Sequence, residues 1–337
     1  MIPRLSAQEV AYPLVHPFKI TRGEESVARS AILRLAVGDL HGLGETAPIT
    51  RYGESVESVL AFFAGYRLTE APYALERILT EKIPAAARCA LDLALHDLLG
   101  KRAGLPLYEL LGLDPRDTPV TSFTIGIADP ETTLSKVAEI ADHPILKVKL
   151  GIGDEATQIE TIASIRAHYS GTIRIDANEG WDAHGAVRLL TALTPYDIEF
   201  CEQPIPAGFP EQLRFVREHT SIPIVTDEDS CTAADLPRLA GCVDGVNIKL
   251  VKCGGIRGAL AMIHTARSLG LKIMLGCMVE TSLLATAAAH LSPLVDWADI
   301  DGPFLIADDP FVGVTYAQGK LVLPNGPGLG VAERNGQ

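Results

Sequence analysis

Two lysines two residues apart, Lys147 and Lys149, lie in the short apolar run that begins at Ile145. Successive side chains of a strand point to opposite faces, so both ammonium groups share one face and the apolar side chains between them share the other. An ammonium group without a partner is costly to bury. If the apolar face packs against helices, the two lysines point inward and need a partner or a chemical role.

Other acids and bases lie at the ends of similar short runs further along the chain. Together with Lys149 they form one set. In chain order, its members are Lys149, Asp176, Glu202, Asp227, Lys249 and Asp301. The carboxyl ends of the strands of a parallel barrel form one mouth, and catalytic residues of such folds collect there. We therefore expect these side chains to meet in one site.

The runs themselves indicate the fold that would position these groups. They begin at residues 121, 145, 173, 197, 223, 244, 272 and 297. Helical patterns lie between them, as in 154–168, 183–193, 210–219 and 256–269. This alternation, with starts about 25 residues apart, is typical of a (β/α) barrel. Because no convincing eighth helix follows residue 301, we predict a modified (β/α)7β TIM-type barrel.

The first third of the chain has a different organisation. Residues 2–20 and 31–37 are rich in strand formers, whereas residues 55–66 and 85–101 have helical patterns. This succession is typical of an α+β unit. We therefore predict an α/β protein with three parts: an α+β capping domain at 1–118, the catalytic barrel at 119–308 and a C-terminal segment at 309–337 that returns to the capping domain.

The barrel order predicts which charged groups are neighbours. The third, fourth and fifth strands are adjacent, so Asp176, Glu202 and Asp227 should converge as three hard oxygen ligands. Such a set suits Mg²⁺ better than Zn²⁺. The second and sixth strands are opposite in a ring of eight, so Lys149 and Lys249 should face each other across the mouth.

This arrangement predicts the removal of a proton from a carbon next to a carboxylate. The metal would hold the substrate carboxylate and neutralise the charge that develops in the enediolate. One lysine would remove the α-proton and the opposite lysine would return a proton to the other face, which gives racemisation or epimerisation. A lysine pKa near 10.4 suits this role poorly at neutral pH, so the two like charges beside a dication would have to lower it.

Composition excludes several classes of function. The 29 basic and 42 acidic residues give a net charge of −13, which disfavours nucleic acids and anionic membrane surfaces. No apolar stretch reaches the roughly 20 residues of a membrane helix, and no apolar core follows Arg4 as in a secretory signal. The six cysteines are scattered, which favours a reduced, cytoplasmic protein.

Several motifs resemble the muconate-lactonizing subgroup of the enolase superfamily. They are LKVKL, IDANEGW, EFCEQP, TDEDS, VNIKL followed by KCGG, and ADIDGP. The helical run AARCALDLALHDLLGKRAGLPLYELLG is similar to that of the family's capping domain, so the resemblance spans essentially the whole chain. Within the subgroup, DIDG, GCM and RYGES most resemble dipeptide epimerases of the L-Ala-D/L-Glu type.

The resemblance implies a small-molecule dipeptide substrate. Asp299 and Asp301 would hold its α-ammonium group, and Arg22, from the first capping loop, would hold the glutamyl side-chain carboxylate. The family's usual Asp-Glu-Ser is Asp-Glu-Asp at residues 227–229 here, which keeps the ligand but changes its surroundings. A homo-oligomer is left open.

Three further residues are candidates for contact with the substrate. Lys147 shares a face with Lys149, and Thr124 in the first strand and Met278 after the seventh are candidates for the pocket wall.

Two kinds of alternative function are open. N-acylamino acid racemase, o-succinylbenzoate synthase and muconate cycloisomerase are reactions of the same subgroup. Their substrates lack a free α-ammonium group, so Asp299 and Asp301 argue against them. The other alternative is a catalytically silent barrel that only binds a ligand, which the complete set of lysines and carboxylates disfavours.

Overall fold

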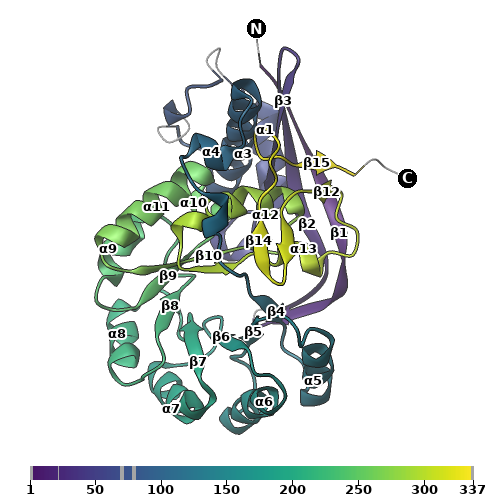
Figure 1. The fold of residues 1–337 in the computed structure, drawn as a ribbon. Coiled ribbons are helices and arrows are strands. Elements are labelled where there is room, and N and C mark those ends of the chain that lie inside the picture. The colour runs from purple at the N-terminus through teal and green to yellow at the C-terminus, as the bar shows by residue number, and fades with distance from the viewer. Residues whose placement is uncertain (1–2, 22, 69–71, 78–80, 335–337) are drawn as a thin grey trace.

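A computed structural model describes residues 3–21, 23–68, 72–77 and 81–334. A three-stranded antiparallel sheet with its helices forms the upper part of the view, and a barrel of eight parallel strands forms the lower part (Figure 1). This architecture confirms the predicted α/β fold with a capping domain. None of the helices in these ranges is long and apolar enough to cross a bilayer.

The barrel strands follow one another around the sheet in chain order. They are β4 (Phe123–Ile125), β5 (Ile145–Lys149), β6 (Thr172–Asp176), β7 (Ile198–Glu202), β8 (Ile224–Thr226), β9 (Gly245–Ile248), β10 (Lys272–Gly276) and β11 (Trp297–Asp299). A parallel bridge between Thr121 and Ala298 brings the first and last strands together. Each of the eight predicted runs therefore supplies one strand.

Helices follow the strands on the outside of the barrel (Figure 1). They are α5 (Pro130–Glu139), α6 (Glu155–His168), α7 (Ala183–Leu193), α8 (Pro210–Glu218), α9 (Leu236–Leu239), α10 (Leu250–Cys253), α11 (Ile256–Ser268), α12 (Ser282–Ala289) and α13 (Gly302–Leu305). The last strand is followed only by the four-residue α13, in agreement with the predicted absence of a full eighth helix.

Local sequence explains where several of these helices begin. Asp129, Asp154 and Asp182 precede α5, α6 and α7, and each side chain accepts a hydrogen bond from a backbone N–H in the first turn. Such caps satisfy N–H groups that have no partner within the helix. Short 3-10 turns complete the connections: η1 (Thr50–Tyr52), η2 (Pro115–Asp117), η3 (Thr194–Tyr196), η4 (Ala233–Asp235) and η5 (Ser292–Leu294).

The capping domain packs a helix directly on its sheet. Its elements are β1 (Arg4–Ile20), β2 (Gly23–Val37), β3 (Leu40–Thr46), α1 (Val56–Gly65), α3 (Ala85–Ala103) and α4 (Leu107–Leu110). A Cβ atom at Gly42 or Gly44 would lie 2.0 or 1.9 Å from a carbonyl oxygen of α3. These glycines of β3 therefore permit the close packing of sheet and helix.

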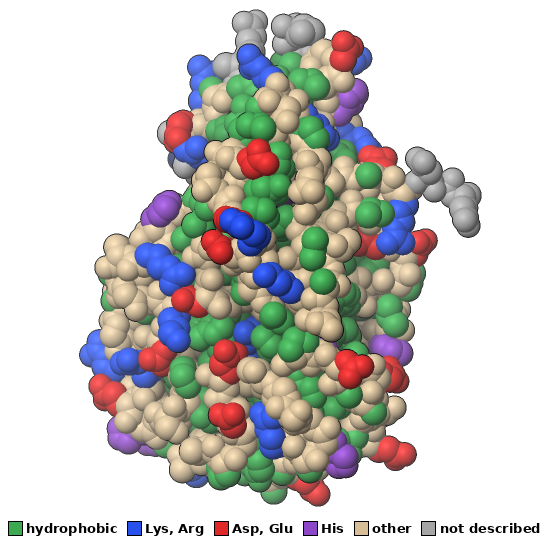
Figure 2. Space-filling view, viewed as in Figure 1, with side chains coloured by type: hydrophobic (Ala, Val, Ile, Leu, Met, Phe, Trp, Pro, Cys, Tyr) green, Lys and Arg blue, Asp and Glu red, His purple; other side chains and the backbone are tan. Residues whose placement is uncertain are grey.

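The long hairpin of β1 and β2 extends from the capping domain down to the barrel (Figure 1). There, Ile127 N–H, just after β4, donates to the carbonyl oxygen of Lys19 over 3.0 Å. The hairpin thus closes one side of the barrel mouth. On the face shown in Figure 2, acidic and basic side chains are interspersed over both parts.

The C-terminal segment contacts both parts of the molecule. Its strands are β12 (Phe311–Val312), β13 (Thr315–Ala317), β14 (Lys320–Val322) and β15 (Ala332–Glu333). Glu333 pairs with Arg34 of the capping sheet, whereas the carbonyl oxygen of Gly319 accepts a hydrogen bond from Thr121 N–H of the barrel. The division of the chain at residues 118 and 308 stays a prediction.

Candidate active site

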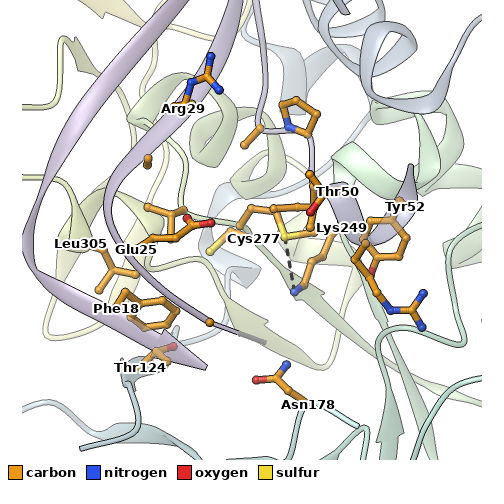
Figure 3. A pocket seen from close by; sticks show the side chains of 18 of the residues that line it. Phe18, Glu25, Arg29, Thr50, Tyr52, Thr124, Asn178, Lys249, Cys277 and Leu305 are labelled. Carbon is orange, nitrogen blue, oxygen red and sulfur yellow. Dashed lines mark hydrogen bonds between the residues drawn. The ribbon is translucent and has the colours of Figure 1, made fainter. Parts of the chain in front are cut away.

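A cavity of about 700 Å³ lies between the capping domain and the carboxyl ends of the barrel strands (Figure 3). Thr50 and Tyr52 of the capping domain contribute to its wall, as do Lys249 and Asn178 of the barrel. Other candidate residues that line it are Thr124, Lys147, Lys149, Asp227, Met278, Asp299 and Asp301. The structure therefore brings most of the predicted site residues to one cavity.

The two candidate bases come from strands that are four apart in the ring, β5 and β9. Lys149 is the last residue of β5, and its Nζ lies 2.7 Å from Oδ2 of Asp176. Lys249 directly follows β9, and its Nζ lies 3.0 Å from Oδ2 of Asp227. Each lysine thus reaches the cavity from an opposite side of the barrel and is paired with a different carboxylate.

The three candidate metal ligands come from adjacent strands. Asp176 and Glu202 end β6 and β7 and are register partners, and Asp227 directly follows β8. All three are buried. Burial would raise the pKa of Asp176, but the charges of Lys149 and Lys147 lower it more strongly.

Asp227 and Glu202 differ in the direction of their pKa shifts. Burial opposes ionisation of Asp227, but Lys249 and Lys252 hold its pKa below the ordinary value. Burial and the charge of Asp176 raise the pKa of Glu202, although Lys147 opposes this shift. Two of the three carboxylates are therefore kept anionic by lysines.

An ammonium group lies among these carboxylates. Nζ of Lys147 is 2.5 Å from Glu202, 2.6 Å from Asp299 and 3.2 Å from Asp176. Burial lowers the pKa of Lys147, but these acids raise it well above its usual value. In the part of the chain that the structure describes, no three acidic, histidine or cysteine side chains lie ready to hold a metal ion.

The donor chemistry of the three carboxylates nevertheless fits a hard dication. Oxygen ligands are those that Mg²⁺ prefers, and an ammonium cation already lies between Asp176 and Glu202.

The carboxylates around Lys249 act on the pKa of its ammonium group. Burial lowers the pKa of this ammonium group, but the carboxylates of Asp227 and Glu202 raise it more strongly. Each of these carboxylates stabilises the charged form of the lysine, and the lowering expected beside a dication stays a prediction.

Asp299 and Asp301 occupy different surroundings. Asp299 accepts hydrogen bonds from Oγ of Ser122 over 2.5 Å and from Nζ of Lys147. Burial would raise the pKa of Asp299, but the charge of Lys147 holds it below the ordinary value. Asp301 accepts from the backbone N–H of Thr124 over 2.6 Å. Burial and the charge of Asp299 raise the pKa of Asp301 to about 6.

Two further candidates for contact with the substrate are Met278 and Arg22. Met278 lines the cavity, and its Sδ lies 4.0 Å from Nζ of Lys249. Arg22 lies outside the described residues, so its contact with the substrate stays a prediction.

Sequence reasoning missed the role of Lys252. Its Nζ donates to Oδ1 of Asp227 over 2.5 Å, to the carbonyl oxygen of Asp227 over 2.6 Å and to that of Asn247 over 3.1 Å. These contacts use all three donors of the ammonium group. The sequence feature that could have indicated this role is the KCGG motif. Its lysine lies two residues after the Lys-Leu pair that ends the sixth predicted strand.

We expect Lys252→Met to destabilise the protein by about 3 kcal/mol, because it leaves buried acceptors without their donor. Urea denaturation would measure this loss. Lys320→Met is the matched control, since Lys320 is exposed and should change stability by no more than about 0.5 kcal/mol. Equal stability of the two variants would contradict the assigned role.

The change from serine to aspartate at residue 229 is accommodated by hydrogen bonds. Asp229 accepts from Nε2 of Gln203 over 2.9 Å and from the N–H of Gly208 over 2.8 Å. Oε1 of Gln203 in turn accepts from the N–H of Asp227 over 2.9 Å. Asp229 therefore belongs to a network that holds the backbone of Asp227.

Arg51 and Glu179 form a second contact that sequence reasoning missed. Arg51 donates through Nη2 over 2.9 Å and through Nε over 3.1 Å to the two oxygens of Glu179. One residue belongs to the capping domain and the other follows β6. The two-bond ion pair thus joins the domains at the edge of the cavity.

Comparison with known proteins places this architecture in a family. Residues 5–112 match the mandelate racemase/muconate lactonizing enzyme N-terminal domain, and residues 133–335 match the enolase C-terminal domain-like family. The chain belongs to the enolase superfamily. The resemblance predicted from the motifs is therefore confirmed.

Individual enolase-superfamily members are similar over nearly the whole chain. An L-Ala-D/L-Glu epimerase of Bacteroides thetaiotaomicron is 38% identical over 326 residues, which are 94% of this chain and 85% of the relative. The substrate-liganded L-Ala-D/L-Glu epimerase of Bacillus subtilis has a TM-score of 0.91 and 31% identity, with 98% of each chain covered.

A third member shows a different dipeptide in the same fold. The dipeptide epimerase of Cytophaga hutchinsonii, in complex with Mg and D-Ala-L-Val, has a TM-score of 0.93 and 30% identity, covering 99% of this chain and 96% of that one. The superfamily fold is thus shared by epimerases of acidic and apolar dipeptides.

Proposed function

We propose that this protein is a Mg²⁺-dependent dipeptide epimerase of the L-Ala-D/L-Glu type. The observation that carries the proposal is the approach of Lys149 and Lys249 to one cavity from opposite barrel strands, each beside its own carboxylate. Such a pair can exchange a proton on either face of one carbon atom. The similarity to dipeptide epimerases supports the same reaction.

Asp176, Glu202 and Asp227 are the residues that would hold Mg²⁺. When bound, this dication would supply positive charge that offsets the charge of the substrate carboxylate. The neutral lysine then takes the α-proton, and the electron pair of the broken C–H bond passes into the adjacent carboxyl group. The opposite lysine, as an ammonium ion, donates its proton to the other face of the α-carbon.

Two acids and one cation would select the dipeptide. The ammonium group of the substrate would bind Asp299 and Asp301, which lie at the wall of the cavity. The glutamyl carboxylate would bind Arg22.

All six cysteines are free thiols, which supports a cytoplasmic location. Assembly into a homo-oligomer would be tested by analytical ultracentrifugation.

A dipeptide library incubated with enzyme and Mg²⁺ in D₂O tests this proposal. Mass spectrometry would detect the uptake of a single deuteron, and chiral analysis would identify the epimerised residue. We expect uptake at the C-terminal residue of L-Ala-L-Glu. Faster turnover of N-acylated amino acids than of any free dipeptide would instead identify the protein as an N-acylamino acid racemase.

We expect Asp301→Asn to weaken turnover of every free dipeptide by roughly ten- to a hundredfold, the effect of one charge-assisted hydrogen bond. An N-acetylated amino acid has no ammonium group and should be affected much less. The ratio of kcat/KM for the two substrates measures the difference. Equal losses on both would show that Asp301 does not recognise the ammonium group.

The pKa of Asp301, raised to about 6, predicts a pH dependence of substrate binding. The carboxyl is neutral below this value and anionic above it, so the KM of a free dipeptide should rise as the pH falls through about 6. The Asp301→Asn variant should lack this rise. A wild-type KM that is constant from pH 5 to 7 would contradict the assignment.

A further inference from the structure

The first turn of α12 is capped by residues from two distant parts of the chain. Glu45 of the capping domain accepts from the N–H groups of Thr281 and Leu284 over 3.2 and 3.1 Å. Asp309 of the C-terminal segment accepts from the N–H of Ser282 over 2.8 Å. These are the groups that a helix cannot satisfy internally. The barrel helix therefore depends on the capping domain for its N-terminal hydrogen bonds.

Glu45 is held from more than one side. Its Oε2 also accepts from the hydroxyl of Thr281 over 2.5 Å, and its side chain is fully buried. Negative charge is favourable at a helix N-terminus, where it interacts with the aligned peptide dipoles. Burial raises the pKa of Glu45, and the hydrogen bonds from Thr281 and Leu284 oppose this rise. A buried carboxylate with this set of donors has one favourable position and resists displacement.

The position of Glu45 links two walls of the cavity. Residues 47–52, which begin two positions after it, line the cavity from the capping domain, and residues 277–279, which end two positions before Thr281, line it from the barrel. Figure 3 shows Thr50 and Tyr52 on one wall and Cys277 on the other. The Glu45–Thr281 contact therefore joins the chain two residues from one wall to the chain two residues from the other.

The barrel wall is connected tightly to this contact. The N–H of Met278 donates to Oε2 of Glu280 over 3.1 Å, which limits the freedom of the loop that leads to α12. Sδ of Met278 lies 4.0 Å from Nζ of Lys249. A movement of α12 relative to Glu45 would therefore shift the surface beside a candidate base.

We propose that Glu45 is a positioning residue, which sets the separation of the two cavity walls and so the fit of the dipeptide. The expected effect on the fit of the dipeptide rests on the proposed epimerase function. The same contact should also determine how well the two walls are ordered, whatever the substrate.

Glu45→Gln tests the proposal with little change in shape. The amide keeps one acceptor oxygen, but its NH₂ group would face a backbone N–H, and two donors cannot form a hydrogen bond. One of the hydrogen bonds from Thr281 or Leu284 is therefore lost. We expect the KM of the dipeptide to rise at least tenfold while kcat falls less than threefold. Glu45→Asp, which keeps the charge but is shorter by one methylene, should raise KM in the same way.

Asp309→Asn is the matched control. It removes a carboxylate from the same helix N-terminus, but Asp309 belongs to the C-terminal segment and lies far along the chain from the cavity-lining residues 47–52. We expect a comparable loss of stability with KM within twofold of wild type. Equal KM effects of the two substitutions, or loss of stability without a KM change in both Glu45 variants, would overturn the positioning role.

Hydrogen–deuterium exchange supplies a readout that does not require activity. In Glu45→Gln, peptides covering 47–53 and 277–284 should both exchange at least threefold faster, whereas in Asp309→Asn the 47–53 peptide should be unchanged. If the wild type epimerises no dipeptide, the proposed function fails and this exchange pattern still decides the structural link. Unchanged exchange in 47–53 of Glu45→Gln would refute the link.

Discussion

Lys149→Ala and Lys249→Ala should each abolish net epimerisation, yet each should still exchange the α-hydrogen of one stereoisomer with solvent. The reason is geometric: the two lysines reach the cavity from opposite strands, so each faces only one side of the α-carbon. A remaining lysine can remove and return a proton on its own side. Inversion requires both.

Proton NMR in D₂O would measure exchange for each stereoisomer of the dipeptide. The two variants should exchange opposite isomers, and net inversion should fall by at least a thousandfold, as expected when a proton-transfer group is lost. Lys320→Ala is the control, because this lysine is exposed and is not among the residues that line the cavity. Exchange of the same isomer by both variants would show that the lysines do not face each other.

Asp176→Asn and Glu202→Gln should each reduce activity by several orders of magnitude without unfolding the barrel. Both side chains are buried beside Lys147, and an amide in either place removes a negative charge that would hold a dication. Binding of Mn²⁺, followed by its paramagnetic resonance signal, should weaken in parallel with activity. This second measurement separates loss of the metal from loss of the substrate.

Glu199→Gln is the matched control for the metal site. Glu199 lies on the same strand as Glu202, but its carboxylate pairs with Arg174 and not with the lysines of the cavity. Its substitution should leave Mn²⁺ binding within about twofold of wild type. Full turnover by wild-type enzyme after exhaustive chelation would contradict the metal assignment altogether.

Local patterns in the sequence were sufficient to predict the barrel and the approximate position of its charged groups. Side chains alternate along a strand whatever its neighbours, so the sharing of one face by Lys147 and Lys149 could be derived from spacing. The repeat of about 25 residues predicted the order of the strands. From that order followed the adjacency of Asp176 and Glu202.

Contacts between distant segments could not be derived in this way. The capping of α12 by Glu45 joins residues 236 positions apart, and no local pattern specifies that pairing. The three acceptors of Lys252 are likewise brought together by the ends of two strands. Such contacts depend on how the two domains and the strand ends pack in space.

The electrostatic state of the site depended on the same packing. The structure places Lys249 beside Asp227 and Glu202, which raise the pKa of its ammonium group. Residue types and spacing predicted which charges share the cavity. Their pairing, and hence the direction of each pKa shift, follows from distances of a few ångströms and from burial, which arise only when the chain is folded.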